Sequence, residues 1–184
     1  MSLYPSEAYA FRSHHHRRSI RLAGYDYTQA GAYFVTICTH RREPLLASIS
    51  ATEYTLTQVG QFVARCWLAL PRHFPHAMLD AWVLMPDHMH GILILRDVNH
   101  ESAVPAPSSR PNGTRPNSLN AIIQNFKSIS TRKVNQIRHA ASTPLWHRDY
   151  YERIVRDDRG LDAIRRYIEN NPARWRERLA PHQI

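Results

Sequence analysis

Two apolar stretches, 78–85 and 88–95, follow one another with only Pro86 and Asp87 between them. Each stretch has the length of a strand rather than that of a helix, and a proline followed by an aspartate favours a tight bend of the backbone. The pattern predicts two paired strands that lie in the centre of a sheet.

The residues before this pair predict one more strand and one helix. Aromatic and β-branched residues of high β propensity fill the stretch 32–39. Between Thr57 and Leu70, apolar residues recur at the three- and four-residue spacing of a buried helix face, and Pro71 then ends the run.

The residues after the pair predict a helix, a strand and a second helix. Ser118 is a suitable N-cap for an amphipathic helix that reaches Val134. The stretch 150–155 is aromatic and β-branched, which favours a strand. Residues 161–170 have the pattern of a helix that ends at Pro172.

In chain order these elements are strand, helix, strand, strand, helix, strand and helix. The first six match the split βαβ pattern of the ferredoxin-like fold. We therefore expect an α+β protein with a βαββαβ, antiparallel-containing sheet, helices on one face, and a further helix at the C-terminal end.

Length and composition indicate one domain. A chain of 184 residues is too short to divide comfortably into two independently folding domains. We assign residues 25–176 to this domain, and we expect 1–24 to be a basic, flexible arm and 177–184 to be a tail. Residues 97–117 are rich in proline, serine and asparagine, which predicts a mobile linker.

The charge of the chain favours a polyanionic partner. It has 24 lysine and arginine residues against 15 aspartate and glutamate residues, a formal net charge of +9, and such a balance is typical of proteins that bind nucleic acid. The apolar stretches are shorter than the roughly 20 residues that cross a bilayer, and the first residues do not form a secretory signal. We therefore predict a cytoplasmic protein without a membrane partner, in which Cys38 and Cys66 are reduced core residues.

His88 and His90 form the first candidate site. Because side chains alternate between the two faces of a strand, both imidazoles project from one face, where they can chelate one ion. Met89 then points into the apolar layer on the opposite face. Taken alone the pair is a weak indication, since a chain with 12 histidines gives this spacing by chance.

Tyr167 and Asn171 form the second candidate site. They lie four residues apart at the end of the last predicted helix, hence on one face. A phenol and an amide oxygen placed in this way can reach one ion or one phosphate together. By themselves, the two residues are better explained as a core tyrosine and a C-terminal cap.

Three separated motifs together resemble one family. They are WVLMPDHMHG at 82–91, YYERIVRD at 150–157 and YIENNP at 167–172. In this order they resemble the histidine motif and the C-terminal segments of the single-tyrosine HUH transposases, in particular the REP-associated tyrosine transposases of bacteria. The likeness runs from about Tyr25 to Arg174.

The resemblance implies a metal-assisted tyrosine nuclease. Tyr167 in the last helix would be the nucleophile, and His88 and His90 would bind Mg²⁺ or Mn²⁺ with Asn171 as a third protein ligand. A hard cation on a phosphate oxygen lets a phenol, whose pKa is ordinarily about 10, attack phosphorus without a strong base. The products would be a 5′-phosphotyrosine link and a free 3′-hydroxyl that can later attack the link.

The resemblance also implies the partner and its contacts. The substrate would be single-stranded DNA at hairpin-forming, REP-like palindromes, bound by a monomer or a homodimer that associates with the nucleoid. At the start of the first strand the chain has Gly31, Ala32 and Tyr33, where some REP-associated members carry Gly-Thr-Trp. The candidate phosphate contacts are basic residues spread around the predicted site: Arg132, Lys133, Arg148, Arg153, Arg156, Arg165 and Arg166.

Rival nucleophiles and rival functions stay open. Tyr150 and Tyr151 are adjacent in a strand and face opposite ways, so we expect them to be structural. In a metal-dependent phosphodiesterase, the ion would activate water and need extra carboxylates, for which Asp80 and Asp87 are available. In a non-catalytic nucleic-acid-binding domain the histidines would only be packed or solvated, and losing either would leave DNA affinity unchanged.

Overall fold

The computed structural model describes residues 22, 24–97, 114–140 and 142–179. Most of the predicted arm (1–24), most of the predicted linker (97–117) and the end of the predicted tail (177–184) lie outside these residues. Among the helices that are described, none has both the length and the apolar character needed to cross a bilayer.

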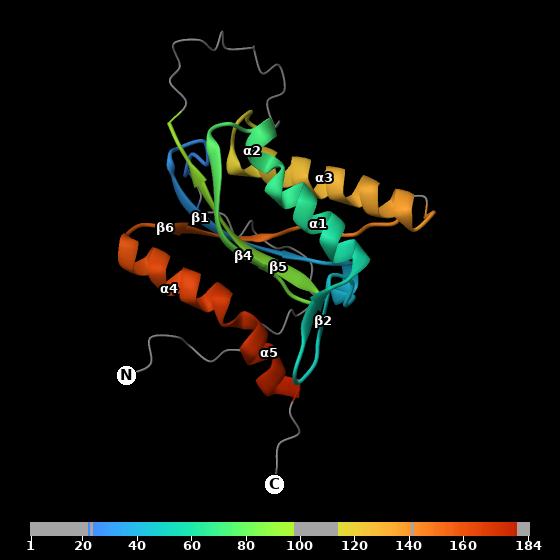
Figure 1. The fold of residues 1–184 in the computed structure, drawn as a ribbon. Helices are drawn as coiled ribbons and strands as arrows, with labels where there is room; N and C mark the ends of the chain where they lie inside the picture. The colour runs from blue at the N-terminus through green and yellow to red at the C-terminus, as the bar shows by residue number, and fades with distance from the viewer. Residues whose placement is uncertain (1–21, 23, 98–113, 141, 180–184) are drawn as a thin grey trace.

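A four-stranded sheet forms the centre of the molecule (Figure 1). In space its strands follow the order β4 (Ala77–Leu84), β5 (His88–Leu95), β1 (Gly31–Cys38) and β6 (Tyr151–Val155). Each strand runs antiparallel to its neighbours. This order and these directions are those of two interleaved split βαβ units, so the predicted ferredoxin-like fold is confirmed.

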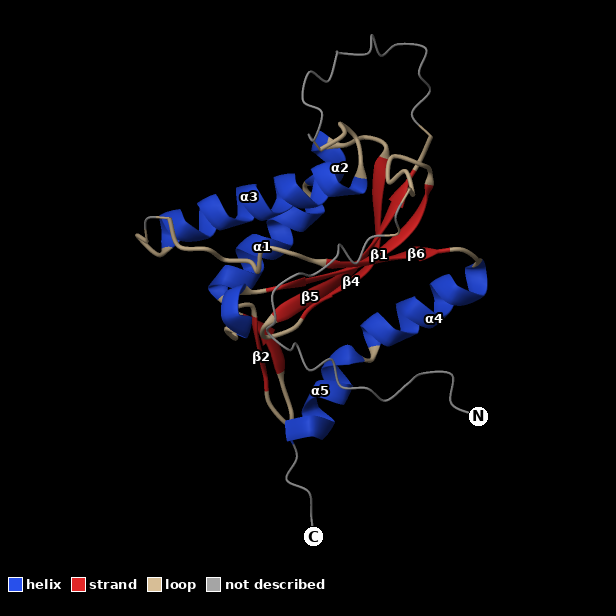
Figure 2. Ribbon diagram, turned by 180° about the vertical axis from the view of Figure 1, so that it is seen from behind, coloured by secondary structure: helices blue, strands red, loops and turns tan. Residues whose placement is uncertain are grey.

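Helices cover both faces of the sheet (Figures 1 and 2). The crossover helices α1 (Gln58–Leu68) and α3 (Leu119–Ile137) lie together on one face, as predicted. The C-terminal helices α4 (Asp158–Glu169) and α5 (Asn171–Leu179) lie on the opposite face. The predicted N-cap Ser118 is confirmed, because its hydroxyl accepts a bond from the amide of Ala121 in the first turn of α3. Thr57 caps α1 in the same way, through the amide of Gly60.

The end of the chain differs from the sequence prediction. Helix α4 starts before residue 161, because Asp157 is its N-cap and accepts a 2.6 Å bond from the amide of Gly160. Pro172 does not end the helical region either. It lies in the first turn of α5, where a proline costs no hydrogen bond, and α5 extends into residues predicted as tail.

Four short elements between β1 and β4 were not predicted. They are the 3-10 turn η1 (His40–Arg42), the strands β2 (Ala47–Ile49) and β3 (Tyr54–Leu56), and the short helix α2 (Leu70–His73). The two strands pair with each other in a second, two-stranded sheet. All four are too short to show a hydrophobic period.

The alternation of β5 divides the core into two clusters. Met89 and Leu93 pack on the α1 and α3 side with Trp67, whereas Ile92 packs on the α4 side. Gly91 also faces α1, where a Cβ would lie 2.6 Å from Cζ2 of Trp67. Both His88 and His90 therefore face α4, as predicted from the sequence.

The two cysteines are free thiols, as predicted. Cys66 is buried in the cluster under α1, and Cys38 at the end of β1 is partly buried. Burial raises the pKa of both thiols.

Candidate active site

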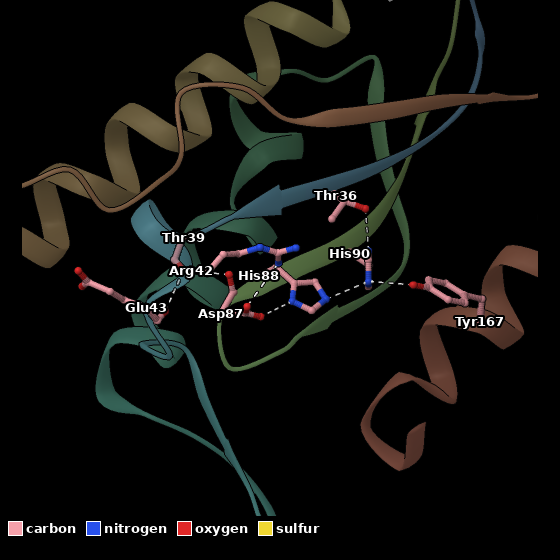
Figure 3. A network of polar contacts seen from close by, with 8 residues as sticks. All are labelled: Thr36, Thr39, Arg42, Glu43, Asp87, His88, His90 and Tyr167. Carbon is pink, nitrogen blue, oxygen red and sulfur yellow. Dashed lines mark hydrogen bonds and ion pairs between the residues drawn. The ribbon is translucent and has the colours of Figure 1, made fainter. Parts of the chain in front are cut away.

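His88 and His90 bring two imidazole nitrogens together on the α4 side of β5 (Figure 3). Their Nε2 atoms lie 3.1 Å apart, and the rings are nearly perpendicular, at 77°. The two residues are 8% and 5% exposed. The pair is thus a buried, two-nitrogen site at the end of a central strand.

The opposite nitrogen of each ring has its own partner. Nδ1 of His88 lies 2.5 Å from a carboxylate oxygen of Asp87, and Nδ1 of His90 lies 2.8 Å from the hydroxyl of Thr36. Because a carboxylate only accepts, Nδ1 of His88 carries a proton and donates to Asp87. Partners of this kind orient the histidine ligands of metal sites.

The spacing of the pair fits one divalent cation. Ligand bonds of about 2.1 Å at a right angle place two donor atoms roughly 3 Å apart, close to the observed 3.1 Å. Burial, the nearby His88 and the charge of Arg42 hold the pKa of His90 well below its ordinary value. The imidazole is therefore neutral, as a ligand must be.

Asn171 lies at the start of α5, one turn after Tyr167. It is buried, and its amide nitrogen is 3.4 Å from the carbonyl of Tyr167. Within the described residues, no group of three or more histidine, cysteine, aspartate or glutamate side chains could hold a metal ion. Asn171 as a third ligand stays a prediction.

The hydroxyl of Tyr167 reaches the histidine pair from α4 (Figure 3). It lies 3.4 Å from Nε2 of His90, and the residue is 37% exposed. Its ring meets Phe34 edge to face, with centroids 6.1 Å apart, and the guanidinium of Arg174 lies 5.6 Å from the ring centre. The structure thus brings together both candidate sites of the sequence.

The rival tyrosines Tyr150 and Tyr151 do not share one environment. Tyr150 packs against the cluster under α1 and α3, whereas Tyr151 packs against the cluster under α4. Their opposite orientations are confirmed, and both rings contribute to the core, as expected for structural residues.

Two arginines beside the site were not predicted. Arg174 comes from α5, which the sequence prediction omitted. Arg42 comes from η1, and its Nη1 atom lies 3.4 Å from Oδ2 of Asp87. Arg41 and Arg42 have φ of 54° and 58°, a left-handed conformation that side chains rarely adopt. No periodic pattern marks such a turn, so spacing could not have identified Arg42.

Asp87 links Arg42 to His88. Burial would raise the pKa of its carboxyl, but the hydrogen bond from His88 and the charges of His88 and Arg42 together lower it. Its backbone carbonyl accepts bonds from the amide and hydroxyl of Thr39. The turn between β4 and β5 is therefore held through both the side chain and the backbone carbonyl of Asp87.

The predicted phosphate contacts have different positions. Arg165 is occupied by ion pairs to Asp80 and Asp162, with N–O distances of 2.6 and 3.0 Å. Arg153 pairs with Phe34 in the sheet register and so projects on the α4 side. Arg132 and Lys133 lie on α3, on the face of the sheet opposite the histidine pair. The exposed set is Arg132, Lys133, Arg148, Arg153, Arg156 and Arg166.

Comparisons with known proteins give a relative in sequence and a solved structure of similar fold. No protein-family model matches the chain. An uncharacterized protein of Haemophilus influenzae is 36% identical over 170 residues, which cover 89% of this chain and 92% of the relative. The structure of a REP-associated tyrosine transposase bound to a REP hairpin matches with a TM-score of 0.58 and 20% identity, over 84% of this chain and 74% of that one. The chain therefore belongs to the family of the Haemophilus influenzae protein, and it has the fold of the REP-associated tyrosine transposase.

Proposed function

We propose that this protein is a transposase-like single-stranded DNA endonuclease and strand transferase, in which Tyr167 attacks a DNA phosphate beside a divalent metal held by His88 and His90. One observation carries the proposal. The hydroxyl of Tyr167 lies 3.4 Å from a nitrogen of the histidine pair, although the two residues are 77 positions apart in the sequence.

The donor set indicates which cation the site would take. His88 and His90 supply nitrogen ligands, and the side chain of Asn171 is the proposed third ligand. Imidazole favours Mn²⁺ over Mg²⁺, whereas an amide oxygen suits both. When bound, the cation would supply a Lewis acid that polarises the phosphate and offsets its charge.

The transfer step exchanges one phosphate ester for another. The oxygen of Tyr167 forms a bond to phosphorus while the bond from phosphorus to the 3′ oxygen breaks. The phenolic proton leaves to solvent, which reaches this partly exposed side chain. The 3′ oxygen takes up a proton from solvent and leaves as a hydroxyl. Arg174, over the ring, stabilises the negative charge that develops on the phenol oxygen.

The charge of the chain and its fold relative support DNA as the substrate. The formal net charge is +9, and the transposase of the same fold is bound to a REP hairpin. We extend this to hairpin-forming palindromes with a single-stranded flank, bound by a monomer or a homodimer. Exposed basic residues would hold the backbone through phosphate contacts.

The phosphodiesterase alternative has less support. It requires carboxylates as further metal ligands, and the two candidates have other partners. Asp87 binds His88 through Nδ1, and Asp80 binds the guanidinium of Arg165. Neither carboxylate is placed as a ligand beside the Nε2 atoms.

A cleavage assay tests the proposal. Labelled single-stranded oligonucleotides tiled from the DNA that flanks the gene are incubated with protein and Mg²⁺ or Mn²⁺, then separated on denaturing gels. We expect a metal-dependent, protein-linked DNA band that is lost in Tyr167→Phe and kept in Tyr150→Phe and Tyr151→Phe. Cutting without an adduct that survives in Tyr167→Phe would instead establish hydrolysis by water. Binding without cutting would indicate the non-catalytic domain.

A further inference from the structure

An ion pair joins the helix that carries Tyr167 to the edge of the sheet. On α4, Nε of Arg165 donates to both carboxylate oxygens of Asp80 at 3.2 and 3.1 Å, and Nη2 donates to one of them at 2.6 Å. The Asp80 side chain, on β4, is only 17% exposed. This two-point contact fixes direction as well as distance.

Asp80 lies in a β-bulge of β4, on the face toward α4. Leu79 pairs with Leu93 and Trp82 pairs with Gly91, so β4 has one extra residue between these positions. Leu79 packs under α1, and strand alternation therefore turns Asp80 to the α4 face, where it meets Arg165. The extra residue places Ala81 in the cluster under α4 as well. The carboxylate of Asp80 also accepts a 2.6 Å bond from the amide of Ala81, within the bulge.

Arg165 and Tyr167 project from opposite flanks of α4. Successive residues of a helix are about 100° apart, so these two side chains diverge by roughly 160° around the axis. Between them, Ile164 and Ile168 form the buried base of the helix. Apolar burial is not directional, whereas the two-point ion pair sets the rotation of α4 about its axis through its geometry.

We propose that Asp80 and Arg165 are positioning residues that fix the rotation of α4 and thereby hold the hydroxyl of Tyr167 at the histidine pair. The proposal rests on the proposed function for its catalytic consequence only. Arg165 also binds Asp162 at 3.0 Å, but Asp162 lies on α4 itself and cannot fix the helix relative to the sheet.

Fluorine NMR tests the position of Tyr167 without any assay of activity. The protein is labelled with 3-fluorotyrosine, and the spectrum of Tyr167→Phe identifies the signal of Tyr167 among those of the nine tyrosines. This signal senses the rings of His90 and Phe34, whose centroids lie 5.2 and 6.1 Å away. We expect Asp80→Asn and Arg165→Gln to shift the Tyr167 signal toward that of an exposed tyrosine. Asp162→Asn and Arg166→Gln, with the same change of charge on α4, should leave it in place.

The covalent adduct with single-stranded DNA gives the second readout. We expect Asp80→Asn and Arg165→Gln to slow adduct formation roughly tenfold to a hundredfold at saturating DNA, where a change in DNA affinity does not affect the rate. Arg165→Lys, a milder change that keeps the charge and loses the two-point contact, should give an intermediate rate and an intermediate signal. An unmoved Tyr167 signal in all three variants would overturn the proposal, as would effects no larger than that of Asp162→Asn. If the wild type forms no adduct, the proposed function fails, and the fluorine signal alone decides the positioning.

Discussion

At the site, each imidazole uses its two nitrogens differently. Nδ1 of His88 is bound to Asp87 and Nδ1 of His90 to Thr36, which leaves both Nε2 atoms turned toward each other. At 3.1 Å the two Nε2 atoms can share one proton or bind one cation together. In the proposed metal site, the cation would take the place of that proton.

Removing the carboxylate behind His88 should weaken metal binding. We expect Asp87→Ala to lower Mn²⁺ affinity roughly 10- to 100-fold, because the ring loses the partner that orients it. Isothermal titration calorimetry measures the change. Glu43→Ala is the matched control, since Glu43 is exposed near the same turn and contacts Thr39 only through its backbone carbonyl. An equal loss in both variants would show that Asp87 has no specific effect.

Arg42 should contact a phosphate of bound DNA. Its guanidinium has only one contact in the site, 3.4 Å long, and retains donors for a second partner. We expect Arg42→Gln to reduce the salt dependence of DNA binding by about one counterion, measured by fluorescence anisotropy of a labelled single strand. Arg41→Gln is the control, because both arginines are exposed and have φ of 54° and 58°. If Arg41→Gln reduced the salt dependence of DNA binding by the same amount, Arg42 would have no specific phosphate contact.

At the scale of elements, β5 contributes side chains to both faces of the sheet. Its odd-numbered residues pack under α1 and its even-numbered residues face α4.

Gly91→Ala should cost about 1 to 3 kcal/mol of unfolding free energy, since the added methyl collides with the buried ring of Trp67. Urea denaturation gives this value. The Mn²⁺ affinity of the folded protein should not change, because the methyl projects from the face opposite the histidines. Unchanged stability with lost metal binding would contradict this division of faces.

The sequence predicted the elements that bury a long periodic face. The strands of the four-stranded sheet, α1 and α3 were found because their hydrophobic patterns are long enough to distinguish helix from strand. Elements of three or four residues, such as β2 and α2, are stabilised by tertiary contacts and carry no pattern. Pro172 predicts a helix end in the sequence but lies in the first turn of α5 in the structure. A proline that follows one helix and a proline that begins the next cannot be distinguished by sequence.

The candidate site was predictable only in part. Alternation along a strand placed both imidazoles on one face, and helical spacing placed Tyr167 beside Asn171. The meeting of Tyr167 with His90 joins residues far apart in the chain, and only the likeness of three motifs to one family indicated it. The partnership of Arg165 with Asp80 joins residues 85 positions apart, which no local pattern reveals.

At the scale of the whole molecule, the main apolar core and the candidate site lie on opposite faces of the sheet. The face under α1 and α3 is an extensive apolar core, whereas the face under α4 combines a smaller apolar cluster with the polar site. The split βαβ order places β5 beside β1 in the sheet interior, so the histidines stand on a strand that is supported on both sides. Tyr167 reaches them from α4, a helix that follows the last strand of the sheet.

Mass spectrometry of the protein–DNA adduct tests the central claim most directly. The adduct formed with metal and single-stranded DNA is digested with nuclease and trypsin, and the peptide that carries the added nucleotide mass is sequenced. Trypsin cuts after Arg148, Arg153, Arg166 and Arg174, so Tyr167 falls on a different peptide from Tyr150 and Tyr151. The account predicts the nucleotide on Tyr167, in the peptide 167–174. A nucleotide on the peptide 149–153, which contains Tyr150 and Tyr151, would contradict it.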